Sequence, residues 1–137
     1  MNNNPKIKLF LVDDDAVLLK LLESELLKHT GFIVETYATG ELCIAHLAHN
    51  PDLIVLDYHL NGIDKYALNG IDTLDKIKAF NEDILVMMLS SQNDMAIALD
   101  CMAHHAFDYI MKNKTTYLQL PQMITTIFNY RKMREEP

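Results

Sequence analysis

Short apolar runs alternate with longer amphipathic stretches along the chain of 137 residues. The apolar runs predict five strands, at positions 7–12, 32–37, 53–56, 84–89 and 107–111. Apolar residues spaced three or four apart predict five helices, over 16–29, 41–48, 71–80, 95–104 and 115–134. This alternation of strand and helix is typical of α/β proteins, in which the strands form a parallel sheet.

Three of the expected strands, at 7–12, 53–56 and 84–89, are apolar almost throughout instead of alternating with polar residues. Such runs are typical of strands that helices bury on both faces. Right-handed crossovers between parallel strands leave few topologies. We therefore expect one α/β domain with an open, doubly wound parallel sheet and helices on both faces.

Several residues mark the expected helix ends. Thr39 and Asp94 can each cap a helix, because their side-chain oxygens accept hydrogen bonds from free amides of the first turn. Gly31 is expected to end the first helix. Pro121 is expected in or near the first turn of the last helix, where its missing N–H is tolerated. The polar stretch 58–69 is expected to be a loop.

The residues that directly follow the strands carry the candidate chemistry, since ligands of open α/β sheets bind beyond the carboxyl ends of the strands. Asp13, Asp14 and Asp15 follow the first strand, Asp57 the third, Ser90 and Ser91 the fourth, and Lys112 the fifth. Each of these alone is also typical of a turn, a helix cap or an exposed surface. Together at one edge of a sheet, they predict a functional site.

Clustered carboxylates repel one another unless a cation lies between them. Mg²⁺ suits them, because it prefers oxygen ligands and is often held by one or two carboxylates and a phosphate. A carboxylate can also act as a nucleophile and form an aspartyl phosphate. An ammonium and a hydroxyl can balance the charge of the transferring phosphoryl group. Asp13, Asp14, Asp57, Ser90 and Lys112 supply these parts.

Four stretches resemble the receiver domain of response regulators in two-component signalling: residues 9–15 (LFLVDDD), 53–60 (LIVLDYHL), 88–91 (MLSS) and 106–112 (AFDYIMK). The chain is also similar to the single-domain chemotaxis response regulator. The resemblance implies a flavodoxin-like strand order of 2-1-3-4-5. It further implies one receiver domain over 1–137, with a core at about 6–130 and a charged helix end at 131–137.

The family pattern implies roles for matching residues. Asp13 and Asp14 match an acidic pair that holds Mg²⁺, with Asp14 the more direct ligand. Asp57 matches the aspartate that is phosphorylated and also contacts the metal, and the backbone carbonyl of His59 matches a third protein ligand. Asp15 lies outside this pair and is expected to cap the first helix.

Three further residues match the rest of the phosphorylation machinery. Lys112 matches a lysine that pairs with the phosphoryl group, and Ser90 matches a hydroxyl residue that moves toward it. Tyr109 matches an aromatic residue that turns inward when the hydroxyl moves, so Ser90 and Tyr109 form the expected switch. The side chains of His59 and Gln92 are expected to flank the site and to tune the lifetime of the phosphate.

The resemblance also implies protein partners. A sensor histidine kinase or a phosphotransfer protein is the expected phosphodonor, and a small phosphodonor can replace it. Phosphorylation is expected to change the affinity of the face formed by 95–104, 107–111 and 115–134 for a downstream protein, or to drive homodimer formation. Beyond its own Mg²⁺-dependent phosphorylation and dephosphorylation, the chain is not expected to be an enzyme.

Two features depart from the family pattern. Asn113 stands where the family usually has a proline, which often follows a cis peptide bond. The Lys112–Asn113 bond is therefore either trans, or cis with strain, since a cis bond before a residue other than proline is costly. Residues 65–69 look like an insertion after the third strand, and Asn61 stands where a proline is common. We favour a tolerated surface insertion over a loop that contacts a partner or shields the site.

Charge and composition bear on the expected partners and on the expected location of the protein. The net charge of -7 weighs against direct binding to nucleic acid or to an anionic membrane. No apolar run approaches the roughly 20 residues of a membrane span, and the polar residues 1–8 lack the apolar segment of a signal peptide. We therefore expect a cytoplasmic protein, and we favour a stand-alone receiver over one domain of a longer regulator.

The remaining candidate ligands predict no second site. Cys43 and Cys101 form neither a CxxC motif nor a zinc spacing, so we expect buried, reduced thiols. Two histidine pairs have no acidic or cysteine partner evident in the sequence and are expected on helix surfaces: His46 with His49, and His104 with His105.

Two other functions stay open. A pseudo-receiver would bind a protein without being phosphorylated, and Asn113 and the insertion favour it slightly. A haloacid-dehalogenase-like phosphatase would use residues 13–17, which fit its D-x-D-x-[TV] motif. However, no second acidic pair follows Lys112 to close such a metal site, and Asp57 would have no role. Neither GxGxxG nor GxxxxGK[ST] occurs, which argues against a nucleotide-binding domain.

Overall fold

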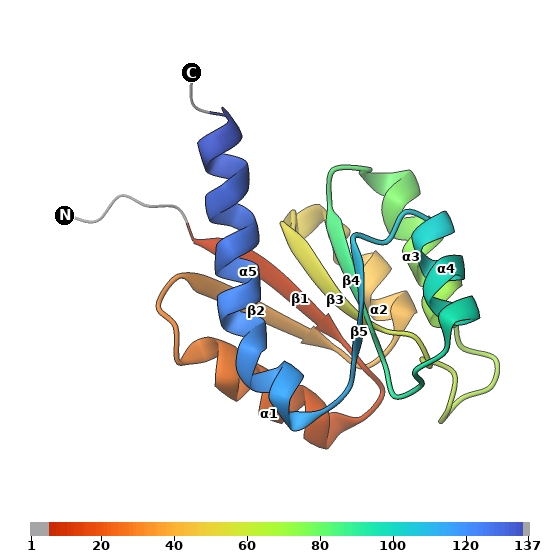
Figure 1. Ribbon diagram of the computed structural model, residues 1–137. Helices are drawn as coiled ribbons and strands as arrows, with labels where there is room; N and C mark the ends of the chain where they lie inside the picture. The colour runs from red at the N-terminus through yellow and green to blue at the C-terminus, as the bar shows by residue number, and fades with distance from the viewer. Residues whose placement is uncertain (1–5, 136–137) are drawn as a thin grey trace.

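Figure 1 shows a twisted sheet with helices packed on both faces. The structure is a computed structural model that describes residues 6–135. Its five strands are parallel and lie in the order β2-β1-β3-β4-β5, which confirms the expected doubly wound sheet. The strands are β1 (Ile7–Val12), β2 (Phe32–Tyr37), β3 (Leu53–Asp57), β4 (Leu85–Ser90) and β5 (Asp108–Met111). The helices are α1 (Ala16–Leu27), α2 (Gly40–Ala45), α3 (Gly70–Phe80), α4 (Met95–Ala103) and α5 (Lys114–Glu135), with a short 3-10 helix, η1 (Leu47–His49), after α2.

The sheet separates two hydrophobic cores. Successive side chains of a strand point to opposite faces, so Leu9 and Leu11 of β1 enter one core, while Phe10 and Val12 enter the other. Helices α1 and α5 cover the first core, and α2, α3 and α4 cover the second. All of β3 is buried, because this strand is central and covered on both faces. Double-sided burial therefore explains the continuous apolar runs in the sequence.

Side-chain caps fix where four helices begin. Asp15, Thr39 and Asp94 accept hydrogen bonds from the first amides of α1, α2 and α4, as predicted. Asn69 caps α3 in the same way, which the sequence analysis did not identify. All four caps follow a strand, so they also shape the loops at the carboxyl edge of the sheet.

Two predicted helix ends are wrong. The first helix ends at Leu27, and Gly31 instead accepts a hydrogen bond through its carbonyl at the start of the β1–β2 pairing. The helix expected over 41–48 is divided into α2 and η1. Helix α2 ends ahead of His46, whose backbone leaves the helical conformation with a φ of -112°. The 3-10 helix then ends at Asn50, which is left-handed with a φ of 59° and precedes a proline, a residue that disfavours helix in the residue before it.

The last helix begins one residue earlier than expected and places its proline differently. Asn113 accepts a hydrogen bond from the Thr116 amide, so α5 starts at Lys114. Pro121 therefore lies in the interior of the helix and not in its first turn. At this position it lacks the amide that would donate a hydrogen bond to the Tyr117 carbonyl. Among the helices of residues 6–135, even this longest one is not apolar enough to cross a membrane.

Both cysteines lie in the same core. Cys43 of α2 and Cys101 of α4 are buried and free, as predicted, beneath the α2, α3 and α4 layer. Burial raises the pKa of the Cys43 thiol to about 12, and burial together with the nearby Asp100 raises that of Cys101 to about 11. Both therefore stay as inert thiols at neutral pH.

Candidate functional site

Four neighbouring strands deliver polar residues to one edge of the sheet. Asp57 is the last residue of β3 and Ser90 the last of β4, while Asp13 and Lys112 directly follow β1 and β5. Since β1, β3, β4 and β5 are adjacent and parallel, their carboxyl ends meet at this edge. The sequence prediction that these residues converge is therefore confirmed in position.

Lys112 joins the two buried carboxylates. Its Nζ lies 2.8 Å from Asp13 Oδ2 and 3.0 Å from Asp57 Oδ1. Asp13 and Asp57 are each only 2% exposed, although charged side chains are rarely buried unless paired. The Lys112 amide also donates to the Ser90 carbonyl at 2.8 Å, which fixes the backbone from which the side chain reaches across.

The charges of this cluster do not balance. Burial and the neighbouring Asp13 raise the pKa of Asp57 to about 6, against the opposing effects of Lys112 and of the His59 amide. Burial alone would lower the pKa of Lys112, but the contacts with Asp13 and Asp57 raise it. One ammonium therefore faces two carboxylates in a poorly solvated position, with Asp14 beside them. A further cation would complete the site.

The oxygen atoms available at this edge fit Mg²⁺. Carboxylate oxygens of Asp13, Asp14 and Asp57 lie within 4.8 Å of one another, and no other such group of three potential ligands occurs among residues 6–135. Asp13 Oδ2 is buried and has no polar partner besides its ion pair with the Lys112 ammonium at 2.8 Å. A buried carboxylate oxygen that can still accept a further ligand, next to two more carboxylates, belongs to the kind of hard ligand set that Mg²⁺ prefers.

The chain after β3 turns back over Asp57. The amide of His59 donates to Asp57 Oδ1 at 3.2 Å, which holds the carboxylate in place. The His59 ring is exposed and stands edge-on to Tyr58. The role of the His59 carbonyl as a metal ligand stays a prediction.

The two predicted switch residues converge on the backbone of Gln92. The buried Ser90 hydroxyl accepts a hydrogen bond from the Gln92 amide at 3.1 Å. The half-buried Tyr109 donates its hydroxyl hydrogen to the Gln92 carbonyl. One peptide segment between β4 and α4 therefore links both hydroxyls. The link runs through the backbone of Gln92, so the identity of its side chain in the sequence does not reveal it.

The residue after Lys112 does not displace its ammonium. No cis peptide bond occurs in the described chain, so the Lys112–Asn113 bond is trans. Lys112 nevertheless reaches both Asp13 and Asp57. Asn113 has a different use, since its side chain caps α5.

The apparent insertion forms an exposed loop beside the site. Ile63 and Tyr66 are 81% and 84% exposed, and no helix or strand forms between β3 and α3. The Leu68 amide donates to the carboxylate of Glu41 in α2, which fastens the loop to the body. Gly62 lies against Asp14, where an added Cβ would stand 3.3 Å from Asp14 Oδ2.

The expectation that the histidines lack acidic partners is wrong. His49 Nδ1 lies 3.0 Å from Glu35 Oε1, and His104 Nδ1 lies 2.7 Å from Asp75 Oδ1. These partners are 14 and 29 residues away along the chain, so no local pattern in the sequence reveals them. Both histidines lie at the ends of helical segments, as expected for surface residues.

Comparison with known families identifies the fold and its class. The sequence model of the response regulator receiver domain matches residues 9–125, which is most of the chain. The chain belongs to this family. Receiver domains are the parts of two-component response regulators that interact with histidine kinases or phosphotransfer proteins, and the acidic edge described above fits their aspartate phosphorylation and Mg²⁺ binding.

Several proteins and solved structures are similar to this chain. It is 30% identical over 112 residues to a protein-glutamate methylesterase/protein-glutamine glutaminase of Trichodesmium erythraeum, and 32% identical over 111 residues to one of Clostridium acetobutylicum. The matches cover 79% and 78% of this chain but only 30% and 31% of those proteins. A CheY-like receiver structure from Methanospirillum hungatei, 21% identical, superposes with a TM-score of 0.78 over 94% of this chain and 98% of its own. This receiver thus spans about a third of those curated relatives, and their activities are not transferred to it.

Proposed function

We propose that this receiver is a cytoplasmic phosphoacceptor in which Asp57 takes a phosphoryl group while Mg²⁺ is bound. The observation that carries the proposal is the contact of buried Asp57 with Lys112 beside an acidic pair at the end of β1. Asp13, Asp14 and Asp57 would hold the metal, together with the His59 carbonyl. Bound there, Mg²⁺ would neutralise charge on the phosphoryl oxygens.

The residues of the chain supply the rest of the transfer. A carboxylate oxygen of Asp57 attacks the phosphorus of a phosphohistidine or of acetyl phosphate. The bond from phosphorus to nitrogen or to the acetyl oxygen breaks, and the leaving group takes up a proton from water where it needs one. Lys112, already 3.0 Å from Asp57, pairs with the new phosphoryl oxygens.

The hydrogen bonds of Ser90 and Tyr109 to the Gln92 backbone suggest how phosphorylation would change the surface of the protein. If Ser90 turns toward the phosphoryl group, its hydrogen bond with the Gln92 amide is lost, and the segment that also holds Tyr109 is released. This would shift a pre-existing equilibrium of the face formed by α4, β5 and α5. The kinase or phosphotransfer protein, the downstream protein and a phosphorylation-dependent homodimer are the expected partners of this cycle.

The proposal is tested by the mass of the intact protein after incubation with acetyl phosphate and Mg²⁺. We expect one added phosphoryl group on the wild type, and none on Asp57→Asn or in the presence of chelator. Absence of the adduct both with acetyl phosphate and with a panel of autophosphorylated histidine kinases would favour the pseudo-receiver instead. Turnover of a phosphate ester that Asp13→Asn abolishes and Asp57→Asn leaves intact would favour the phosphatase.

A further inference from the structure

Helix α4 is held to the body by few apolar contacts. Cys101 is its only buried residue, whereas Met95, Leu99 and Met102 are exposed. An element with so little buried surface has low local stability, so each polar contact at its ends carries more weight. The N-terminal end follows the loop that contains Gln92, close to the phosphorylation site.

The C-terminal end of α4 is tied to α3 by one side chain. His104, the C-cap of α4, places Nδ1 2.7 Å from Asp75 Oδ1 of α3 and Nε2 3.5 Å from Asp100 Oδ1 of α4. A neutral imidazole has one N–H, so it can donate to only one of these carboxylates, whereas an imidazolium can donate to both. The arrangement of the two ring nitrogens therefore fits the protonated ring.

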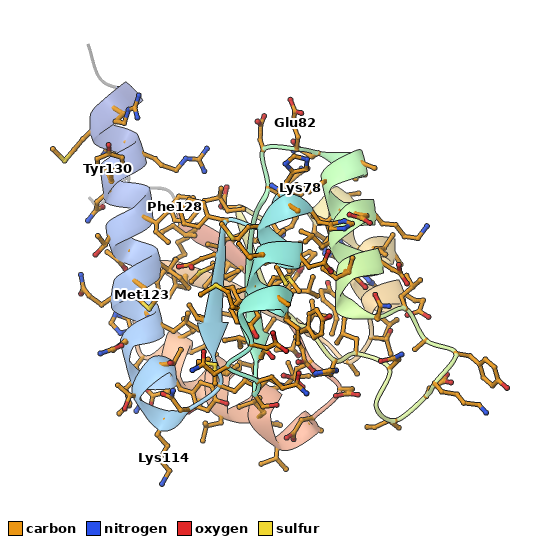
Figure 2. The ribbon with its side chains drawn as sticks, turned by 45° about the vertical axis from the view of Figure 1, so that its right-hand side comes forward. Lys78, Glu82, Lys114, Met123, Phe128 and Tyr130 are labelled. Carbon is orange, nitrogen blue, oxygen red and sulfur yellow. The ribbon has the colours of Figure 1, made fainter. Side chains whose placement is uncertain are left out.

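The other charged groups nearby do not compete for His104. Lys78, Glu82, Asp83 and His105 line a neighbouring hollow of about 380 Å³, and Figure 2 shows Lys78 and Glu82 at this end of α3. The Lys78 ammonium is occupied by the carbonyls of Glu82 and Ile84. The carboxylates that contact His104 are therefore Asp75 from α3 and Asp100 from its own helix, and the bond to Asp75 raises the pKa of His104.

We propose that His104 is a proton-controlled latch that ties the C-terminal end of α4 to α3. Phosphorylation at the opposite end would then move α4 about a fixed point while the ring is protonated, and would move it more freely once the ring is neutral. This effect of His104 on the movement of α4 after phosphorylation rests on the proposed function. The latch itself is a property of the unphosphorylated protein, so it can be tested alone.

The test follows the histidine resonances and the amide exchange of unphosphorylated protein by NMR between pH 5.5 and 8.5. His29 is the control position for substitution, because it is exposed and lies against Phe32, away from His104 in the sequence. We expect His104 to titrate at a higher pH in the wild type than in Asp75→Asn, which lacks the carboxylate that raises its pKa. Once corrected for the intrinsic effect of pH, exchange in the last turn of α4 should be about two- to fivefold slower at pH 6 than at pH 8, as for a surface ion pair.

Variants separate the latch from a general effect of acid. Asp75→Asn and His104→Gln should each remove the pH dependence of exchange in α4, and His29→Gln should leave it intact. The latch is refuted if His104 titrates at the same pH in the wild type and in Asp75→Asn, or if exchange in α4 responds to pH equally in these two proteins. A latch found in a protein that neither acetyl phosphate nor the panel of histidine kinases modifies would stand, while the proposed phosphorylation would fail.

Discussion

At the scale of single residues, the buried carboxylate of Asp57 is subject to opposing influences. Burial and Asp13 disfavour its charged form, while Lys112 and the His59 amide favour it, and the balance raises its pKa to about 6. Between about pH 4 and pH 6 the folded protein therefore holds a proton that the unfolded chain, with an ordinary pKa near 3.9, has released. Stability consequently falls as the pH rises through this window, and the loss is complete above it.

Asp57→Asn should therefore stabilise the protein when no divalent cation is present. We expect the stability difference between variant and wild type to grow by about 2 to 3 kcal/mol from pH 4 to pH 7.5, since each unit of pKa shift is worth about 1.4 kcal/mol. Urea unfolding in chelator at both pH values measures it. Asp83→Asn, on an exposed residue, is the matched control, and equal pH profiles for both variants would contradict the prediction.

The identities of the site residues were predictable because a parallel sheet gathers whatever follows its strands. Asp13, Asp57 and Lys112 each stand directly at a strand end, so their position in the sequence fixes their place in space. Their contacts were not predictable. The sharing of one ammonium by two carboxylates and the pairing of His104 with Asp75 depend on side-chain directions across elements distant in the chain.

At the scale of elements, the start of α3 controls the segment that follows Asp57. A Cβ on Gly70 would lie 2.6 Å from the Tyr58 carbonyl and 2.7 Å from that of Asp57. The Gly70 amide also donates to the Tyr58 carbonyl, which draws the two backbones together. Only glycine fits this approach, so α3 is packed directly against the site.

Gly70→Ala should therefore lower the free energy of unfolding by about 1 to 3 kcal/mol, the range for forcing an atom into a filled space. It should also slow phosphorylation by acetyl phosphate, because the backbone that orients Asp57 must shift. Gly31→Ala is the control, since nothing lies within 4 Å of the added Cβ. Similar urea midpoints for the two variants would contradict this account.

The exposed loop before α3 should behave as a tolerated insertion. Tyr66→Ser removes a side chain that touches little beyond the Lys65 ammonium over its ring. We expect the free energy of unfolding to change by less than about 0.5 kcal/mol, and the rate of adduct formation with acetyl phosphate to stay the same. A slower rate with this small donor would show that the loop shields the site, whereas a defect confined to transfer from a kinase would assign it to partner contact.

The elements themselves were easier to predict than their ends. Caps that combine a polar residue with a following apolar helix, such as Asp15 and Asp94, were evident in the sequence. The division of α2 from η1 at His46 and the depth of Pro121 within α5 have no comparable marker in the sequence. Local propensity alone does not settle such ends.

At the scale of the whole molecule, Mg²⁺ should stabilise the fold by binding only the folded state. The ligand set joins the ends of β1 and β3 and exists only when these strands are paired. Added Mg²⁺ should raise the urea midpoint of the wild type at pH 7.5, and chelator should reverse the effect. Asp14→Asn should reduce the response, and a full response in this variant would remove Asp14 from the ligand set.

The architecture as a whole was predictable because its signal is repeated. Five strand-helix units with continuous apolar strands leave little choice but a covered parallel sheet, and the strand order then follows the family pattern. The distribution of helices over the two faces could not be obtained from apolar spacing alone, since that spacing shows which side of a helix is buried and not which core receives it.

The placement of both cysteines beneath one helical layer gives the molecule a built-in chemical reporter. Cys43 and Cys101 lie under α2 and α4, and the core beneath α1 and α5 contains no thiol. A thiol-reactive dye can therefore modify the folded protein only when the α2, α3 and α4 layer opens. The rate of labelling would measure how often that layer opens, without any engineered probe. Comparing the phosphorylated and unphosphorylated protein would show whether a bound phosphoryl group raises this opening rate.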